Sequence, residues 1–270
     1  MVFDLLGFFI FFELTLIPIY LLILIYGSRE RKIRASYLIS LYTLFGSIFM
    51  FFNIFYCFAK FGTTNFFVLM TLDFAPEDAK FLWITFFIAF AAKIPMIPFH
   101  IWLPEAHVEA PTIGSVILAA LLLKLGTYGI LRFLLHLFPE ATLYFSPLIN
   151  VFALISIVFT SLTAIRQIDL KKIIAYSSIG HMNVVLLGML IPSVESLEGT
   201  IFQMLSHGII AGALFFIVGA FSGKSNFWHL GELGGGPLGQ TWGCHQNFDL
   251  FHHFLNLNKK IRSFLLRTPR

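Results

Sequence analysis

Charged residues are scarce in this sequence. They make up 12% of its 270 residues, whereas about a quarter is usual for a soluble domain. Hydrophobic residues account for 58%, and the mean hydropathy is +0.85. Apolar runs of about 20 residues recur along the chain, which is the length that crosses a bilayer as a helix. The composition excludes an ordinary soluble domain and predicts a protein that crosses a membrane several times.

Motifs that hold cofactors are also missing. The two cysteines, Cys57 and Cys244, form neither a metal-binding spacing nor a disulfide framework. The sequence has no glycine-rich phosphate loop and no cysteine cluster for an iron–sulfur centre. We therefore expect no cofactor and no metal on this chain, and we expect any redox cofactor of the system on another chain.

Several compositional features bear on location. The first apolar stretch is too long for a signal peptide and follows no basic region, so no cleavable targeting segment is expected. The 34 phenylalanines are typical of a chain encoded in a compact, AT-rich organelle genome. The net charge of +4 is concentrated in loops and in the tail, which relates it to membrane orientation and not to nucleic acid.

The hydrophobic pattern predicts an all-α, polytopic helix bundle with about seven transmembrane helices, the third of them broken. Each apolar run is long enough to cross the hydrocarbon at 1.5 Å per residue. The expected transmembrane domain is 1–221, and 222–270 is a basic tail in which 248–266 forms either an interfacial amphipathic helix or irregular structure. The seven predicted spans are 5–26, 37–59, 81–99, 112–136, 143–165, 173–192 and 199–221.

The loops between these spans differ in charge. Segments 27–34 (GSRERKIR) and 166–172 (RQIDLKK) are basic, as is the tail, whereas 73–78 and 195–198 carry acidic residues. The positive-inside rule places the basic loops on the cytoplasmic or matrix side. The loop with Glu105 and Glu109 goes against this pattern, so it is expected to have a role beyond topology.

Lys93 is the least expected residue of the apolar run 81–99 (FLWITFFIAFAAKIPMIPF). A lysine at the centre of a membrane helix costs at least about 2.5–3.5 kcal/mol, so it persists mainly where it has a partner or a function. Pro95 and Pro98 follow at once and break the helix, which frees backbone carbonyls that protein or water must satisfy. A buried cation beside a broken helix is how transporters build an ion site at mid-membrane.

Five ionisable residues of the spans fall at similar predicted depth, near the middle of the membrane. They are Glu13, Lys93, Lys124, His181 and His207. Intramembrane ionisable groups usually face the bundle interior or water. Burial favours the neutral amine of a lysine, whereas a nearby carboxylate favours the ammonium. Moving the carboxylate therefore makes the lysine bind or release a proton. The pattern predicts a proton relay along the membrane plane.

Structural roles compete with this interpretation. Glu13 could serve only as a counter-ion for the lysines, and His181 and His207 could be buried histidines that simply satisfy hydrogen bonds. His100 and His107 flank the helix break, where either could cap or line it. The sequence alone leaves these alternatives open.

The segment around these residues resembles a known family. Residues 93–133 (KIPMIPFHIWLPEAHVEAPTIGSVILAALLLKLGTYGILRF) resemble the core of the antiporter-like subunits of respiratory complex I, mitochondrial-type members most of all. Further matching pieces are 12–23 (FELTLIPIYLLI), 27–35 (GSRERKIRA), 166–183 (RQIDLKKIIAYSSIGHMN) and 203–210 (QMLSHGII).

The resemblance implies roles for single residues. Glu13 corresponds to the family's glutamate, Lys93 to its broken-helix lysine and Lys124 to its central relay lysine, and His181 and His207 fall on matching histidines. It also implies NADH:ubiquinone oxidoreductase as the enzyme, flavin and iron–sulfur clusters on partner subunits, and the mitochondrial inner membrane or, as an alternative, a bacterial plasma membrane. Other membrane-arm subunits and lipids such as cardiolipin are the implied partners.

The resemblance is incomplete at both ends. The family's early helices are absent, and so is its second broken helix with a further ionisable group. Either the subunit is split between chains, or this sequence is a partial or degenerate copy. Three hypotheses follow: a proton-translocating membrane-arm subunit of complex I, a subunit of a cation/proton antiporter, or a structural remnant that no longer pumps.

Overall fold

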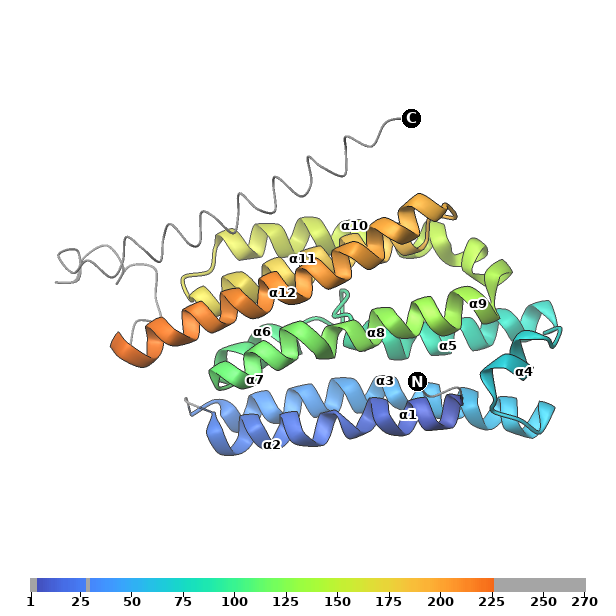
Figure 1. Cartoon of the computed structure of the whole chain (residues 1–270), viewed down its shortest axis with the longest axis horizontal. Helices are drawn as coiled ribbons and strands as arrows, with labels where there is room; N and C mark the ends of the chain where they lie inside the picture. Colours follow the sequence, from blue (N-terminus) through green and yellow to red (C-terminus); the bar gives the residue numbers. More distant parts are fainter. Residues whose placement is uncertain (1–3, 28–29, 226–270) are drawn as a thin grey trace.

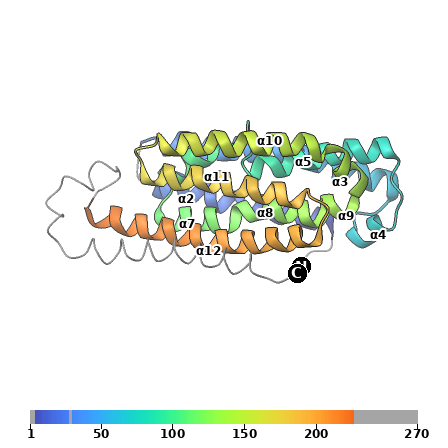
Figure 2. The same cartoon turned by 90° about the horizontal axis from the view of Figure 1, so that it is seen from above.

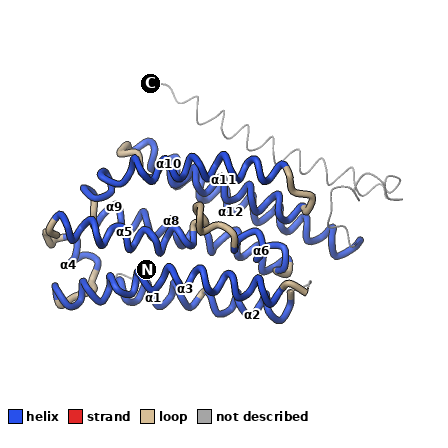
Figure 3. Tube along the Cα trace, turned by 180° about the vertical axis from the view of Figure 1, so that it is seen from behind, coloured by secondary structure: helices blue, strands red, loops and turns tan. Residues whose placement is uncertain are grey.

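The computed structural model describes residues 4–27 and 30–225. Within these residues every regular secondary-structure element is a helix (Figure 3). The predicted all-α class is confirmed. The helices are α1 (Leu5–Leu14), α2 (Leu16–Tyr26), α3 (Lys32–Phe61), α4 (Phe66–Met70), α5 (Pro76–Lys93), α6 (Trp102–Glu109), α7 (Thr112–Ile117), η1 (Leu118–Leu122), α8 (Leu123–Gly129), η2 (Ile130–Leu134), α9 (Leu135–Leu137), α10 (Pro139–Ile165), α11 (Leu170–Met189) and α12 (Val194–Ser225).

Each of the seven predicted spans falls on helical structure. Five segments of the described chain are long and apolar enough to cross a membrane: Leu5–Tyr26, Lys32–Phe61, Thr112–Leu137, Pro139–Ile165 and Val194–Phe221. The remaining two predictions are 81–99, which falls on α5 and the break that follows it, and 173–192, which falls on α11. The count of seven spans therefore stays a prediction, as does the interfacial helix at 248–266, which lies outside the described residues.

The long helices lie side by side in three groups (Figure 1). Helices α1 to α3 form one edge, the segments α5 to α9 form the middle, and α10 to α12 form the opposite edge. Seen from above, the helices run along one common long direction (Figure 2). The middle group therefore contacts both edges and holds most of the buried core, including Phe86, Phe90 and Trp102.

The two ends of the bundle differ in charge. The junctions between α2 and α3 and between α10 and α11 lie at one end, on the left in Figure 1, and both are basic. The junctions between α3 and α5 and between α11 and α12 lie at the other end and carry Asp73, Glu77 and Glu195. This arrangement agrees with the alternation of loops on which the predicted orientation depends.

The break between α5 and α6 is closed by other parts of the protein. The backbone N–H of Met96 donates to the carbonyl of Ala91 (3.3 Å), which Pro95 cannot serve because it has no N–H. The indole of Trp102 donates to the carbonyl of Ala92 (2.9 Å), and Ser156 of α10 accepts from the N–H of Ile97 (3.1 Å). Freed backbone groups are thus satisfied internally, as a low-dielectric surrounding requires.

Helix α8 approaches α5 closely through two glycines. A Cβ at Gly126 would lie 2.8 Å from Cγ1 of Ile94, and a Cβ at Gly129 would overlap the ring of Phe90. Small residues at helix contacts allow such approach in membrane proteins. This contact places the helix of Lys124 directly against the helix of Lys93.

We predict that Gly129→Ala destabilises the bundle by about 1–3 kcal/mol, the usual cost of overpacking a filled core. The Phe90 ring cannot move aside easily because it is fully buried among Phe8, Phe12 and Phe86. The measurement is the thermal midpoint of the detergent-solubilised protein. Gly199→Ala is the matched control, since no atom lies within 4 Å of a Cβ at that position, and equal midpoints for the two variants would contradict the prediction.

Candidate functional site

Lys93 lies against the first span. Its side chain is almost fully buried, at 1% exposure. The Nζ atom donates to the backbone carbonyl of Phe12 (2.6 Å) and lies 3.2 Å from the centre of the Phe12 ring. A carbonyl dipole and an aromatic face both stabilise a cation. One residue of span one thus supplies two contacts to the buried ammonium.

The backbone of span one is interrupted where Lys93 meets it. Helix α1 ends at Leu14 and α2 begins at Leu16, with Thr15 between them. The hydroxyl of Thr15 also donates to the carbonyl of Phe12 (2.9 Å). A carbonyl oxygen has two lone pairs, so this single acceptor binds both Lys93 and Thr15.

Glu13 adjoins this contact. Both of its carboxylate oxygens are buried, and it interacts electrostatically with Lys93 and faces Ser47 of α3. The structure therefore brings Glu13 and Lys93 together from different spans, beside the interruption of each. The direct hydrogen bond of Lys93, however, goes to the backbone carbonyl of Phe12, the residue before Glu13.

Lys124 begins a second cluster. Its Nζ atom donates to the carbonyl of Ala119 (2.5 Å) and lies 2.8 Å from Nδ1 of His207. The ring of His207 lies 5.9 Å from that of His181, measured between centroids. The second cluster thus runs from α8 through α12 to α11 and contains the other three predicted relay residues.

Two π-helical segments flank Lys124, η1 before it and η2 after it. Such segments widen the helix by one residue per turn and often occur at functional sites. Ala119, which accepts from Lys124, belongs to η1. The apolar pattern of the run gave no sign of these segments.

The two clusters are joined by packed side chains. In the described residues no direct hydrogen bond links Lys93 to Lys124. Ile94, which follows Lys93, lies against Gly126, two residues beyond Lys124. Proton transfer between the clusters therefore needs water or a side-chain movement.

The exceptional acidic loop contacts a basic one. Glu105 of α6 lies 3.8 Å from Nζ of Lys172, and Nζ of Lys171 donates to the carbonyl of Ala110 (2.9 Å). The sequence indicated that Glu105 had a role beyond topology but not which residue it meets. The 166–172 segment holds the second half of the broken helix at the basic end.

The two histidines near the break belong to neither of the hydrogen-bonded clusters above, although His107 is close enough to Lys124 and His207 to interact with them electrostatically. His100 is mostly buried and makes an edge contact with Phe159 of α10 (5.6 Å between ring centroids). His107 is fully buried, and its ring stacks on that of Phe215 of α12. His100 also hydrogen-bonds to the backbone of Pro98 and so lines the break, and both histidines contact neighbouring helices.

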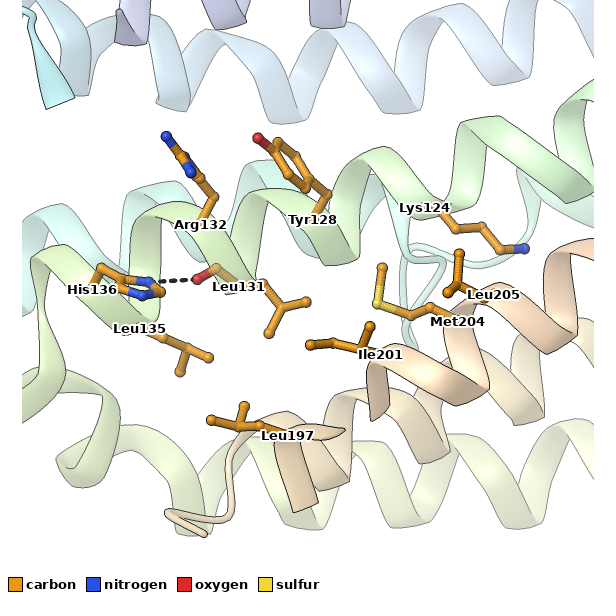
Figure 4. Close-up of a pocket in the computed structure, with 10 residues that line it drawn as sticks. All are labelled: Lys124, Tyr128, Leu131, Arg132, Leu135, His136, Leu197, Ile201, Met204 and Leu205. Atoms are coloured by element: carbon orange, nitrogen blue, oxygen red, sulfur yellow. Dashed lines mark hydrogen bonds between the residues drawn. The ribbon is translucent and has the colours of Figure 1, made fainter. Parts of the chain in front are cut away.

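A groove opens beside Lys124 (Figure 4). Its volume is about 670 Å³, and its walls come from the α8–α9 segment and from α12. Lys124 lies at one end of the groove, and Arg132 and His136 lie at the other. Ile201 and Leu205 on its wall are 47% and 67% exposed, so the groove opens on the surface of the bundle.

The chain is similar to known membrane proteins. It is 58% identical over 217 residues to NADH-ubiquinone oxidoreductase chain 4 of Marchantia polymorpha, a match that covers 80% of this chain and 44% of that protein. The fold matches a chain of respiratory complex I from Thermus thermophilus with a TM-score of 0.81 and 30% identity, over 85% of this chain and 50% of that one. A chain of the Mrp complex from Dietzia sp. shares the fold with a TM-score of 0.73 and 24% identity, over 82% and 24%.

These matches agree with the resemblance seen in the sequence and with its extent. The chain spans less than half the length of the curated relative it matches, as the missing helices predict. The family model described as NADH:quinone oxidoreductase/Mrp antiporter, transmembrane, matches residues 3–233. The chain belongs to this family of antiporter-like membrane proteins.

Proposed function

We propose that this chain is a proton-translocating membrane-arm subunit of respiratory complex I in the mitochondrial inner membrane. The contact between Lys124 and His207 (2.8 Å) carries the proposal, because two proton-exchanging groups in direct hydrogen-bond contact inside an apolar bundle are costly unless they are used. The similarity to NADH-ubiquinone oxidoreductase chain 4 supports the choice of complex.

The first step of the proposed relay is the pairing of Glu13 with Lys93. With the carboxylate near, the ammonium form of Lys93 is stabilised, and with the carboxylate displaced, burial favours the neutral amine. Redox energy released on other subunits would change this pairing. Lys93 would then release its proton towards Lys124.

The second step uses the other cluster. Lys124 in its ammonium form donates to Nδ1 of His207, and His181 lies next along the line. A neutral imidazole can accept a proton on one nitrogen and release one from the other. The proton would leave Lys124 in the direction of α11 and α12.

The proposal places the redox chemistry on partner subunits. Flavin and iron–sulfur clusters belong there, and this chain contributes to NADH:ubiquinone oxidoreduction only through proton transfer. Its partners would be other membrane-arm subunits and lipids such as cardiolipin. No nucleic-acid partner is proposed.

A further partner would be a separate chain that supplies the missing helices. Lys124 lines a groove with mostly apolar walls that opens on the bundle surface, and a lysine at this depth is too costly to leave facing lipid. Packing of protein against the groove would cover it.

A subunit of a cation/proton antiporter is the second candidate. The family also contains Mrp antiporters, and the Dietzia Mrp chain shares the fold. A structural remnant is the third, since the chain corresponds to only part of a longer relative. A mass-spectrometric inventory of the membrane particle that contains this chain separates the three.

Flavin- and iron–sulfur-binding subunits together with a chain bearing the missing helices would support the first candidate. Other antiporter subunits without redox proteins would support the second. A redox particle that has no chain with the missing helices, and in which the relay variants below pump normally, would support the third.

We predict that Lys124→Ala lowers the proton transfer carried by this subunit by about 100-fold, the usual contribution of a proton-exchanging group. Lys124→Arg should fail as well, because a guanidinium stays protonated at any accessible pH. The measurement is the number of protons pumped per electron in sealed membrane vesicles, with assembly checked on native gels. Normal pumping by the arginine variant would mean that charge alone is needed.

We predict that Glu13→Gln also stops proton transfer, although it keeps the shape and hydrogen bonding of the side chain. The amide cannot stabilise the ammonium of Lys93 by charge. Glu13→Asp keeps that charge and should be partly active. Pumping and ubiquinone reduction are measured together. A Gln variant that pumps like the unchanged protein would contradict the proposed pairing of Glu13 with Lys93.

A further inference from the structure

His107 is the buried polar group that the proposed relay does not use. Its ring is fully buried and stacks in parallel on that of Phe215, with 4.2 Å between centroids and 3° between planes. Neither ring nitrogen has a hydrogen-bond partner among the described residues. Buried polar atoms are nearly always paired, and leaving them unpaired costs free energy.

The position of His107 relates it to two lysines. Lys171 and Lys124 both act on it electrostatically, and His107 also acts on His207. Lys171 belongs to α11 at the basic end of the bundle, where its Nζ atom binds the carbonyl of Ala110. Lys124 belongs to the proposed relay, so His107 lies between that relay and the basic end.

The state of the ring follows from these neighbours. Full burial above all, and then the two nearby cations, oppose a positive charge on the imidazole, so we take His107 as neutral at rest. A neutral imidazole has one N–H donor and one bare acceptor nitrogen. Buried polar atoms that have no protein partner are usually bound by buried water, so we infer one water molecule at each nitrogen of His107.

We propose that His107 is a proton-transfer residue that links the basic face of the membrane to Lys124 and His207 through water bound at its two nitrogens. In each transfer the bare nitrogen gains a proton from water on the Lys171 side, and the other nitrogen releases its proton to water on the His207 side. The ring ends each transfer neutral but in its other tautomer, so a half-turn about the Cβ–Cγ bond must restore the first tautomer before the next transfer. Phe215 covers one face of the ring.

This inference rests on the proposed function and adds to it a path for proton uptake. The path begins at the Glu105–Lys172 contact, where both side chains are about a quarter exposed. It continues past Lys171 to His107 and ends at Lys124. Glu105, the acidic residue in the loop that departs from the charge pattern, would then lie at the entrance of the path.

Water access is tested first, without reference to pumping. His107→Cys is introduced into the chain within the assembled complex, and a small, membrane-impermeant cationic methanethiosulfonate is added from one side of sealed vesicles. We expect at least about tenfold faster labelling from the side of the basic loops. The unsubstituted chain, with Cys57 and Cys244, gives the background, and labelling at background rate or faster labelling from the acidic side would overturn the inference.

Proton transfer is tested with two further variants. His107→Gln keeps hydrogen bonding to water but cannot relay a proton, so pumping per electron should fall as far as in Lys124→Ala. His107→Ala should fall equally and recover when imidazole is added to the medium, a rescue that a structural role would not give. His252→Gln, a histidine outside the family match, is the matched control.

The outcomes separate this inference from the proposed function. If Lys124→Ala loses pumping while His107→Gln pumps normally, the inference is wrong and the proposed function stands. If Lys124→Ala itself pumps normally, the proposed function is wrong. Loss of pumping in both His107 variants without rescue by imidazole would assign His107 a packing role and overturn the inference.

Discussion

The structure depends on how an ammonium group is kept inside a hydrocarbon-like interior. Lys93 is nearly inaccessible, so it needs polar contacts that a regular helix cannot offer, because every carbonyl of such a helix is already bonded. The polar contact of Lys93 lies where two helix interruptions come close together, one at Thr15 in the first span and one directly after Lys93. The Phe12 carbonyl, three residues before Thr15, accepts the hydrogen bond from Lys93, the last residue of α5 before the break. The close glycine contacts between α5 and α8 then fix where Lys124 can lie.

Much of this could be predicted from the sequence because its causes are local. Apolar runs determine the helices, and prolines determine the break after Lys93. Glu13, Lys93 and Lys124 could be singled out as candidates because a buried lysine or glutamate is costly enough to need a reason. The contacts between them could not be predicted, since the Lys124–His207 hydrogen bond joins residues 83 positions apart. The π-helical segments beside Lys124 were also missed, because a widened turn leaves the composition unchanged.

The role proposed for His107 could not be predicted from its residue type. A neutral histidine is cheap to bury, so its presence near the break favoured a cap or a lining residue as much as a functional one. Its significance comes from three tertiary features: full burial, nitrogens without protein partners, and a position between Lys171 and Lys124. Glu105 differs because its charge in the wrong loop was visible in the sequence, and only its partner, Lys172, required the structure.

The arrangement also constrains the direction of proton movement. The proposed uptake path starts at the basic end and reaches Lys124, whereas Glu13 and Lys93 approach Lys124 through α5. Lys124 therefore has two proposed sources of protons and, in the described chain, a groove on its remaining side with Arg132 and His136 at the far end. The guanidinium of Arg132 is a fixed cation and would repel an arriving proton along that wall. A carboxylate on a helix packed into the groove would add a proton acceptor on this side of Lys124, besides the proposed route through His207 and His181.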